Sequence, residues 1–205
     1  MNKDYQTFVI GGTAGLISTL SYVAAITIPS LGYRGANLLG MVWAVLGIVY
    51  SYALFRLLAA ERQGLANRLG LIFAVAGFAT VAAMISVQLA VRSGVASLGL
   101  PVAQQETAQL ILRITRLVDQ GLDVAWDVFI GTALVCVSIP MFSHSRFGRL
   151  WAIPSALLGL LLIVLNLLTF PWPPATKGLF DIGPAVGLYV IALSLRMLRL
   201  GVKLR

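Results

Sequence analysis

The chain has 205 residues, of which 59% are apolar and only 11% are charged. Soluble domains contain about 45–50% apolar and about 25% charged residues, so this composition excludes a water-soluble globule and a disordered chain. The single cysteine, Cys136, excludes a disulfide scaffold. We therefore predict one polytopic membrane domain that covers residues 1–205.

Six runs of mostly apolar residues reach the length of about 20 residues that crosses the hydrocarbon core as a helix. They do not alternate as the strands of a membrane β-barrel do, so the predicted fold is an all-α bundle of six transmembrane helices. The first run is longer than the apolar core of a signal peptide, and we expect it to remain as a helix. The predicted spans are 7–28, 37–58, 69–91, 122–142, 150–170 and 182–200.

Basic residues are sorted between the two sides of these spans. Ten of the fifteen fall on one side, together with two of the seven acidic residues. Basic residues mark cytoplasmic loops, so we expect both termini in the cytoplasm of a bacterial cell and the connections 29–36, 92–121 and 171–181 outside its inner membrane. The predicted inner rim comprises Lys3, Arg56, Arg62, Arg68, Arg146, Arg149, Arg196, Arg199, Lys203 and Arg205.

This inner rim is expected to contact anionic lipid head groups of the bilayer, above all through the tail 196–205. The basic residues are scattered at helix ends and do not form a basic face with aromatic platforms. We therefore expect no nucleic-acid partner.

Small residues recur at helical spacing along the first three spans. Such faces let helix backbones approach closely inside a bilayer. They favour a tight monomeric bundle, with a homodimer as the alternative. The residues are Gly11, Gly15 and Thr19, then Gly40, Ala44, Gly47 and Ser51, then Gly70, Ala74 and Gly77.

The segment before the fourth span carries a polar stripe on one helical face. Its polar residues alternate in steps of three and four, which places them on one side of a helix. An amphipathic helix is therefore predicted over approximately 101–120, on the outer side. If it ran unbroken into the span it would measure about 60 Å, so it must project or bend, and Gly121 is the expected bend. The stripe comprises Glu106, Gln109, Arg113, Arg116, Gln120, Asp123 and Asp127.

Two placements of this amphipathic helix compete. In the favoured one, it lies along the outer membrane interface with its polar stripe in water. In the other, the stripe turns inward and lines a water-accessible vestibule. Asp127 lies inside the span, where an unpaired carboxylate costs about 2.5 kcal/mol or more at full depth. It therefore needs a partner, access to water or a proton.

The residues expected to form an outward-facing polar pocket gather around Asp127. For Asp123 and Asp127 a cation or proton site competes with a salt bridge, although Arg116 is two and three turns away from them. Asp119 is expected to pair with Arg116 at i, i+3. Asp181 has a structural explanation as a helix cap, and Asn166 has one as a helix–helix hydrogen-bond donor. The candidate ligand-binding residues are Arg113, Arg116, Asp123, Trp126, Asp127, Asn166 and Asp181.

Several chemistries lack the residues that they need. His144 is the only histidine, which excludes bis-histidine haem and histidine-rich zinc sites. Cys136 has no histidine near it in sequence, and no phosphate-binding loop or dinucleotide motif occurs. We expect no cofactor, no metal site and no catalytic residue.

The C-terminal half resembles an uncharacterised family of bacterial multi-pass membrane proteins. The resemblance rests on three short elements: a tryptophan–acid pair at 126–127, an Asn…Phe-Pro element at 166–171 and the stretch 178–184. It covers about the last 85 residues. It implies the same architecture and no particular activity.

Three functions fit this pattern. The first is small-molecule or ion binding, sensing or transport through the pocket around Asp127. The second is a structural or accessory subunit that docks other membrane proteins, and the third is a membrane-embedded enzyme acting on lipid-like substrates. The absence of an internal repeat and of prolines in mid-span weakens a carrier.

Overall fold

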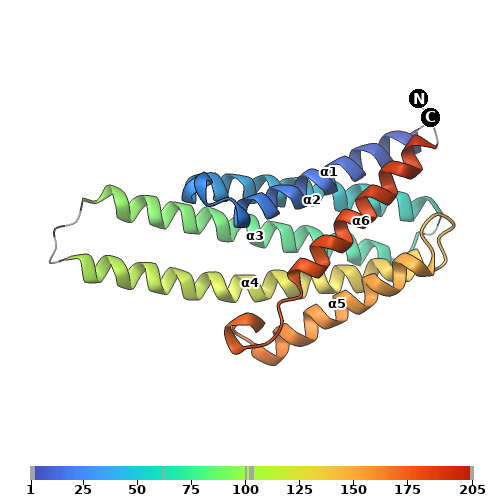
Figure 1. The fold of residues 1–205 in the computed structure, drawn as a ribbon. Coiled ribbons are helices and arrows are strands. Elements are labelled where there is room, and N and C mark those ends of the chain that lie inside the picture. Colours follow the sequence, from blue (N-terminus) through green and yellow to red (C-terminus); the bar gives the residue numbers. More distant parts are fainter. Residues whose placement is uncertain (1–2, 62, 100, 102–103, 204–205) are drawn as a thin grey trace.

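Six long helices run back and forth along one axis in a computed structural model that describes residues 3–61, 63–99, 101 and 104–203 (Figure 1). All six are long and apolar enough to cross a membrane, which confirms the predicted fold class of a multi-pass helical membrane protein. The described residues contain no strand. The helices are α1 (Lys3–Thr27), α2 (Gly32–Glu61), α3 (Leu65–Ser97), α4 (Gln105–Phe142), α5 (Arg149–Thr169) and α6 (Gly183–Val202), with short 3-10 turns η1 (Pro29–Leu31) and η3 (Pro174–Lys177).

Several helices extend beyond the predicted spans: α2 already begins at Gly32, inside the predicted connection 29–36, and the largest differences are in α3 and α4. α3 continues past the predicted end of its span to Ser97, and α4 begins at Gln105 and runs through Gly121 without a break. The expected bend at Gly121 is therefore wrong. One glycine costs a helix interior only about 1 kcal/mol, and the neighbouring leucine, isoleucine, arginine and glutamine residues are good helix formers. Residues 102–103 of the predicted amphipathic helix lie outside the described residues.

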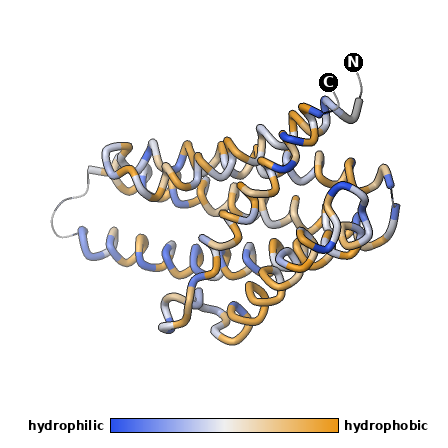
Figure 2. Tube along the Cα trace, turned by 45° about the vertical axis from the view of Figure 1, so that its right-hand side comes forward, coloured by the Kyte–Doolittle hydropathy of each residue, from blue (hydrophilic) through white to orange (hydrophobic). Residues whose placement is uncertain are grey.

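The α3–α4 hairpin is longer than the rest of the bundle. With 33 and 38 residues, these helices measure about 50 Å and about 57 Å, whereas α5 and α6, with 21 and 20 residues, measure about 30 Å. The hairpin extends beyond the other helices at the end opposite the termini (Figure 1). Hydrophilic residues recur along this projecting half of α4 (Figure 2). The amphipathic segment thus continues in line with the rest of α4.

Most helices pack against their neighbours in the chain, but α6 packs mainly against α1. α1 lies between α2 and α6, α3 between α2 and α4, and α4 between α3 and α5, while α5 and α6 share a much smaller contact. The largest apolar core lies towards the end that carries the termini, where Phe8, Leu58, Met141 and Met197 are fully buried.

Small residues mark the helix contacts, as the sequence predicts. A Cβ at Gly47 of α2 would collide with the ring of Phe78 in α3, and one at Gly70 of α3 would lie 2.6 Å from Val137 in α4. The closest backbone approach joins α4 to α5: a Cβ at Gly131 would lie 2.7 Å from the Gly159 carbonyl oxygen. Such approach requires residues without side chains.

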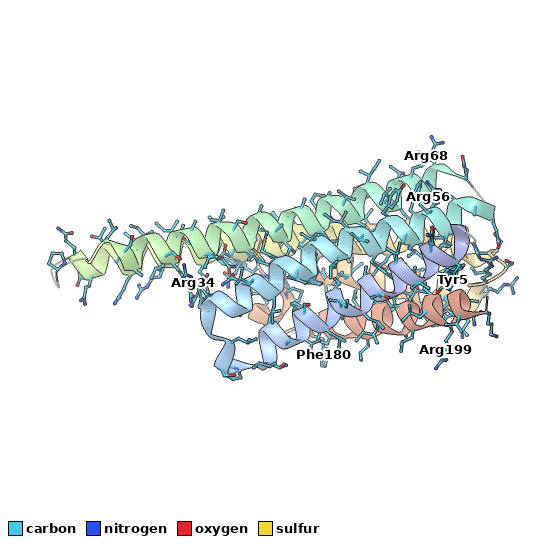
Figure 3. The ribbon with its side chains drawn as sticks, turned by 90° about the horizontal axis from the view of Figure 1, so that it is seen from above. Tyr5, Arg34, Arg56, Arg68, Phe180 and Arg199 are labelled. Carbon is cyan, nitrogen blue, oxygen red and sulfur yellow. The ribbon has the colours of Figure 1, made fainter. Side chains whose placement is uncertain are left out.

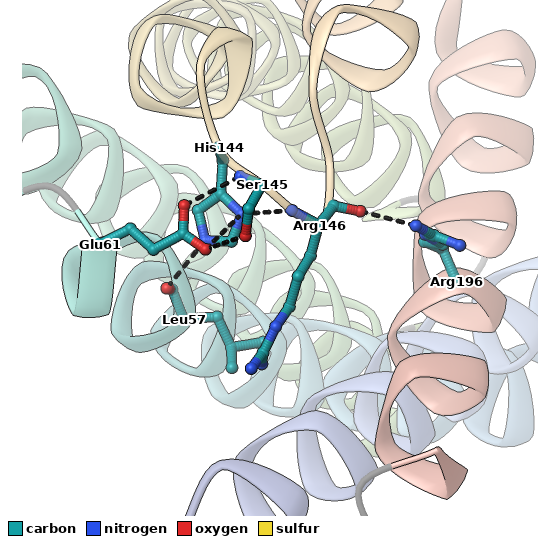
Figure 4. A network of polar contacts seen from close by, with 6 residues as sticks. All are labelled: Leu57, Glu61, His144, Ser145, Arg146 and Arg196. Atoms are coloured by element: carbon teal, nitrogen blue, oxygen red, sulfur yellow. Dashed lines mark hydrogen bonds and ion pairs between the residues drawn. The ribbon is translucent and has the colours of Figure 1, made fainter.

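A polar network ties the connection between α4 and α5 to α2 (Figure 4). The buried His144 ring places Nε2 3.2 Å from the Leu57 carbonyl, which can only accept, so Nε2 carries the proton. Its Nδ1 accepts the Arg146 backbone N–H at 3.1 Å. Glu61 at the end of α2 accepts the backbone N–H of Ser145 at 2.9 Å and also its hydroxyl. These bonds hold the 143–148 turn against the bundle.

The basic residues predicted on one rim do gather at one end. Arg56, Arg68 and Arg199 lie at the end that carries Tyr5 and the termini, whereas Arg34 lies towards the other end (Figure 3). Arg62 and Arg205, expected on the same rim, lie outside the described residues.

Replacing Gly159 by alanine should destabilise the protein, because its Cβ would lie 2.5 Å from the Gly131 carbonyl oxygen. Overpacking of this kind costs about 1–3 kcal/mol, so the midpoint of thermal unfolding in detergent, followed by circular dichroism, should fall. Gly121→Ala is the matched control: its Cβ meets nothing within 4 Å, and it should leave the midpoint unchanged or raise it. Equal midpoints for Gly159→Ala and the wild type would contradict the close α4–α5 contact.

Candidate functional site

A groove of about 790 Å³ lies between the outer halves of α3 and α4. The polar stripe of α4 lines this groove from Gln109 to Asp123, so it faces α3, as in the second of the two predicted placements. The physical reason is the extension of α3, which gives the stripe a packing partner. The groove is lined by Tyr33, Met84, Gln88, Arg92, Val95, Ala96, Gln109, Leu112, Arg113, Thr115, Arg116, Asp119, Gln120 and Asp123.

Charge changes sign along the groove. Arg113 and Arg116 are exposed and lie nearer the tip of the hairpin, whereas Asp119 and Asp123 follow them towards the bundle. From α3, Arg92 places its guanidinium carbon 4.1 Å from the centroid of the Tyr33 ring. The groove is therefore basic towards its tip and acidic towards the bundle.

The predicted ion pair between Asp119 and Arg116 is wrong. No such pair forms in the described part of the chain. The groups that act on Asp119 come from α3, where Gln88 lies near its carboxyl and Arg92 contributes a favourable charge. The i, i+3 spacing permits a local pair, but the extended α3 brings Arg92 near the carboxyl instead.

Asp127 lies one turn deeper than Asp123 and faces α5. Its side chain is only 6% exposed, and its Oδ2 accepts a hydrogen bond of 2.8 Å from Nδ2 of Asn166, which is 1% exposed. The same Nδ2 donates to the Leu162 carbonyl of its own helix at 2.9 Å. Asn166 therefore acts as an interhelical donor, as its structural interpretation predicts, and its acceptor is the carboxyl of Asp127.

Three buried polar atoms around this pair have no hydrogen-bond partner. They are Oδ1 of Asp127, Oδ1 of Asn166 and Nε1 of Trp126. Because both Nδ2 bonds set the orientation of the Asn166 amide, its unpartnered atom is an acceptor. Two acceptors and one donor thus remain unsatisfied near the deep end of the groove, although buried polar groups in proteins are nearly always paired.

The aspartates lie close enough to repel one another. Charge on Asp123 and on Asp181 acts on Asp127, and charge on Asp181 acts on Asp123. Among the described residues, no lysine or arginine forms an ion pair with Asp123 or Asp127. The alternative of a salt bridge therefore does not account for these two carboxyls.

Asp181 itself behaves as its structural explanation predicts. It is exposed, and its Oδ1 accepts the backbone N–H of Gly183 at 2.8 Å, at the start of α6. It contributes charge to the site rather than a buried contact.

Aromatic rings flank the aspartates. The Trp126 ring meets Trp43 edge-on at a centroid distance of 5.2 Å, and Trp43 packs on Tyr22 at 4.4 Å. Tyr22 in turn lies within electrostatic reach of Asp123, Asp127 and Asp181. Acidic groups and aromatic faces therefore meet between α1, α2 and α4.

The candidate residues form two connected parts. Arg113, Arg116 and Asp123 line the groove, whereas Asp127, Asn166 and Trp126 lie outside its lining and below it, and Asp181 stands at the surface. Sequence reasoning missed Tyr33, Gln88, Arg92 and Tyr22. Gln88 and Arg92 are spaced i, i+4 and therefore share a helical face. This pattern becomes visible only if α3 is taken to continue past the apolar run.

Within the ranges that the structure describes, no group of three or more histidine, cysteine, aspartate or glutamate side chains is placed to hold a metal ion. Comparison with protein-family models, with curated proteins and with solved structures found no match.

Proposed function

We propose that this multi-pass membrane protein binds a small positively charged molecule or ion at the deep end of the groove, next to Asp127. The observation that carries the proposal is the buried Asp127–Asn166 pair, whose two Oδ1 atoms lack partners while no basic residue pairs with the carboxyl. A positively charged hydrogen-bond donor would satisfy both oxygens, and charge-assisted hydrogen bonds are stronger than those between neutral groups.

The surrounding rings support an organic cation. Tyr22 lies within electrostatic reach of the carboxyls, and Trp43 and Trp126 pack in a row with it; aromatic faces attract ammonium groups. The three aspartates are not arranged as a metal site, which favours an amine, a monovalent ion or a proton over a divalent metal.

The helices favour binding or sensing over carrier transport. Carriers place substrate at discontinuous helices near the middle of the membrane. Here α4 is continuous, and its Pro140 lies in the last turn, while Pro154 of α5 lies near the start of that helix.

Asp127→Asn should abolish ligand binding and leave the folded yield intact, because an amide of the same shape still accepts the hydrogen bond from Asn166. The probes are tetramethylammonium, glycine betaine and sodium ions, each measured by its shift of the thermal unfolding midpoint in detergent. A ligand present at 100 times its Kd stabilises the native state by about 2.7 kcal/mol. We expect at least one probe to raise the midpoint of the wild type and not that of the variant.

Asp181→Asn is the matched control, since this substitution removes the same charge from an exposed position. The Asp181→Asn variant should keep most of the shift in midpoint. Loss of folded protein in Asp127→Asn would indicate a structural pair instead. Equal shifts in Asp127→Asn and the wild type would contradict the proposal.

We also propose that both termini face the cytoplasm of a bacterial inner membrane, so that the groove opens outward. The gathering of Arg56, Arg68 and Arg199 at the end with the termini supports this orientation, because basic residues are enriched on cytoplasmic sides.

Cysteine labelling tests this orientation. Gln105→Cys and Lys177→Cys in intact cells should react with a membrane-impermeant maleimide, whereas Lys203→Cys should react only after the cells are opened. The wild type, with Cys136 alone, measures background labelling. Labelling of Lys203→Cys in intact cells would reverse the proposed topology.

A second candidate, an accessory subunit, is supported by the apolar face of the projecting hairpin. Five large apolar side chains on one side of α4 are exposed there: Leu110, Ile111, Ile114, Leu117 and Val118. A contiguous exposed apolar face is typical of an interaction surface.

If this face docks another membrane protein, Ile114→Glu should release a partner that co-purifies with the wild type in mild detergent. Arg113→Glu, a neighbouring change that lies on the groove side, should retain it. Isolation of the wild type as a lone monomer after mild extraction would exclude the accessory role.

A further inference from the structure

A second pocket lies at the opposite end of the bundle, beneath the turn between α2 and α3. It has a volume of about 440 Å³, within the range of about 300–1,000 Å³ typical of small-molecule sites. Its polar side chains come from α1, α2, α3 and the turn between α2 and α3, and comprise Thr7, Arg56, Gln63, Asn67 and Arg68. The proposed role of Asp127 does not involve this pocket.

The pocket is positively charged. Arg56 and Arg68 line it from α2 and α3, and no acidic residue is among its lining residues. The nearby Glu61 is engaged by the backbone N–H and hydroxyl of Ser145. α3 also begins here, and Gly64 at its N-cap has no side chain to cap the first turn. Arginines and a helix N-terminus both favour a bound anion.

One buried atom in the pocket adds a second requirement. The Asn67 side chain is 1% exposed, and its Nδ2 donates to the Phe55 carbonyl at 3.2 Å. Its Oδ1 is buried and has no hydrogen-bond partner. Because the Nδ2 bond sets the orientation of the amide, the unsatisfied atom is an acceptor, which a bare anion cannot satisfy. A ligand that completes this site must bring a hydrogen-bond donor as well as negative charge.

We propose that this pocket binds a polyol phosphate, with its phosphate at Arg56 and Arg68 and a hydroxyl donating to Oδ1 of Asn67. The glycerophosphate head group of phosphatidylglycerol has this chemistry, and so does free glycerol 3-phosphate. The pocket lies at one end of the bundle. Both faces of a membrane carry lipid head groups, so a lipid can reach this end in either orientation of the protein.

Native mass spectrometry of the full chain in non-ionic detergent tests the site with two lipids of equal charge, of which only one has hydroxyls in its head group. Phosphatidylglycerol and phosphatidylmethanol carry the same phosphodiester charge, but only phosphatidylglycerol can donate to Asn67. We expect the wild type to bind phosphatidylglycerol about tenfold more tightly. Asn67→Leu should abolish this preference while it still binds phosphatidylmethanol.

Arg56→Gln and Arg68→Gln should each weaken the binding of both lipids about tenfold. These two residues are exposed, so their replacement does not disturb the core, and they keep the test decisive even if Asn67→Leu fails to fold. Arg199→Gln, which removes the same charge from an exposed position at the same end, is the control and should bind like the wild type.

Competition by free glycerol 3-phosphate distinguishes the two sources. Displacement of the lipid by millimolar glycerol 3-phosphate would identify a soluble ligand, and its failure to compete would identify the lipid. Equal binding of the two lipids by the wild type would overturn the proposal. An equal loss in Arg199→Gln and Arg56→Gln would overturn it too, because it would show nonspecific attraction to basic residues.

Discussion

The backbone contact between α4 and α5 positions the buried polar pair of this protein. Gly131 and Gly159 approach so closely that a Cβ on either would lie within about 2.7 Å of the other's carbonyl oxygen. Gly131 lies one turn beyond Asp127, and Gly159 lies two turns before Asn166. The short amide of Asn166 can reach the carboxyl of Asp127 at 2.8 Å only because the two helices are this close. Apolar burial does not drive helices together inside a bilayer, and small residues allow their close packing instead. This close packing positions the two polar side chains next to each other.

Two buried polar side chains in this fold are satisfied to different degrees. His144, 5% exposed, has both ring nitrogens engaged, one by the Leu57 carbonyl and one by the Arg146 N–H. Asp127, 6% exposed, keeps one oxygen without a partner. A buried acceptor that is left unpaired costs about 1–3 kcal/mol, so a structural role alone gives no reason to keep the carboxyl there. His144 holds a turn in place, whereas Asp127 keeps one oxygen that can still accept a hydrogen bond.

Much of this arrangement could be predicted from the sequence, because each transmembrane span is an apolar run and the stripe from Gln109 to Asp127 repeats with the helical period. The depth of Asp127 followed from that period, but its pairing with Asn166 did not. The extension of α3 did not, since residues 92–97 are not an apolar run and hydropathy cannot detect a helix that leaves the membrane. Gln88 and Arg92 were missed for this reason, and Asn67 was missed because a lone asparagine beside a turn carries no pattern.

The order of charges in the groove bears on the kind of ligand that the proposed site would take. Arg113 and Arg116 line the same groove as Asp123, and Arg116 lies seven residues, or about 10 Å of helix, from Asp123. That separation is close to the screening length of about 8–10 Å at physiological ionic strength, so the arginines oppose a cation at the mouth without cancelling the attraction of the aspartates at the base. A molecule that carries an anionic group as well as an amine meets favourable charge at both ends of the groove. The charge order therefore favours a zwitterionic small molecule over an inorganic cation, and it sets the orientation of that molecule, with its amine towards the bundle and its anionic group towards the tip.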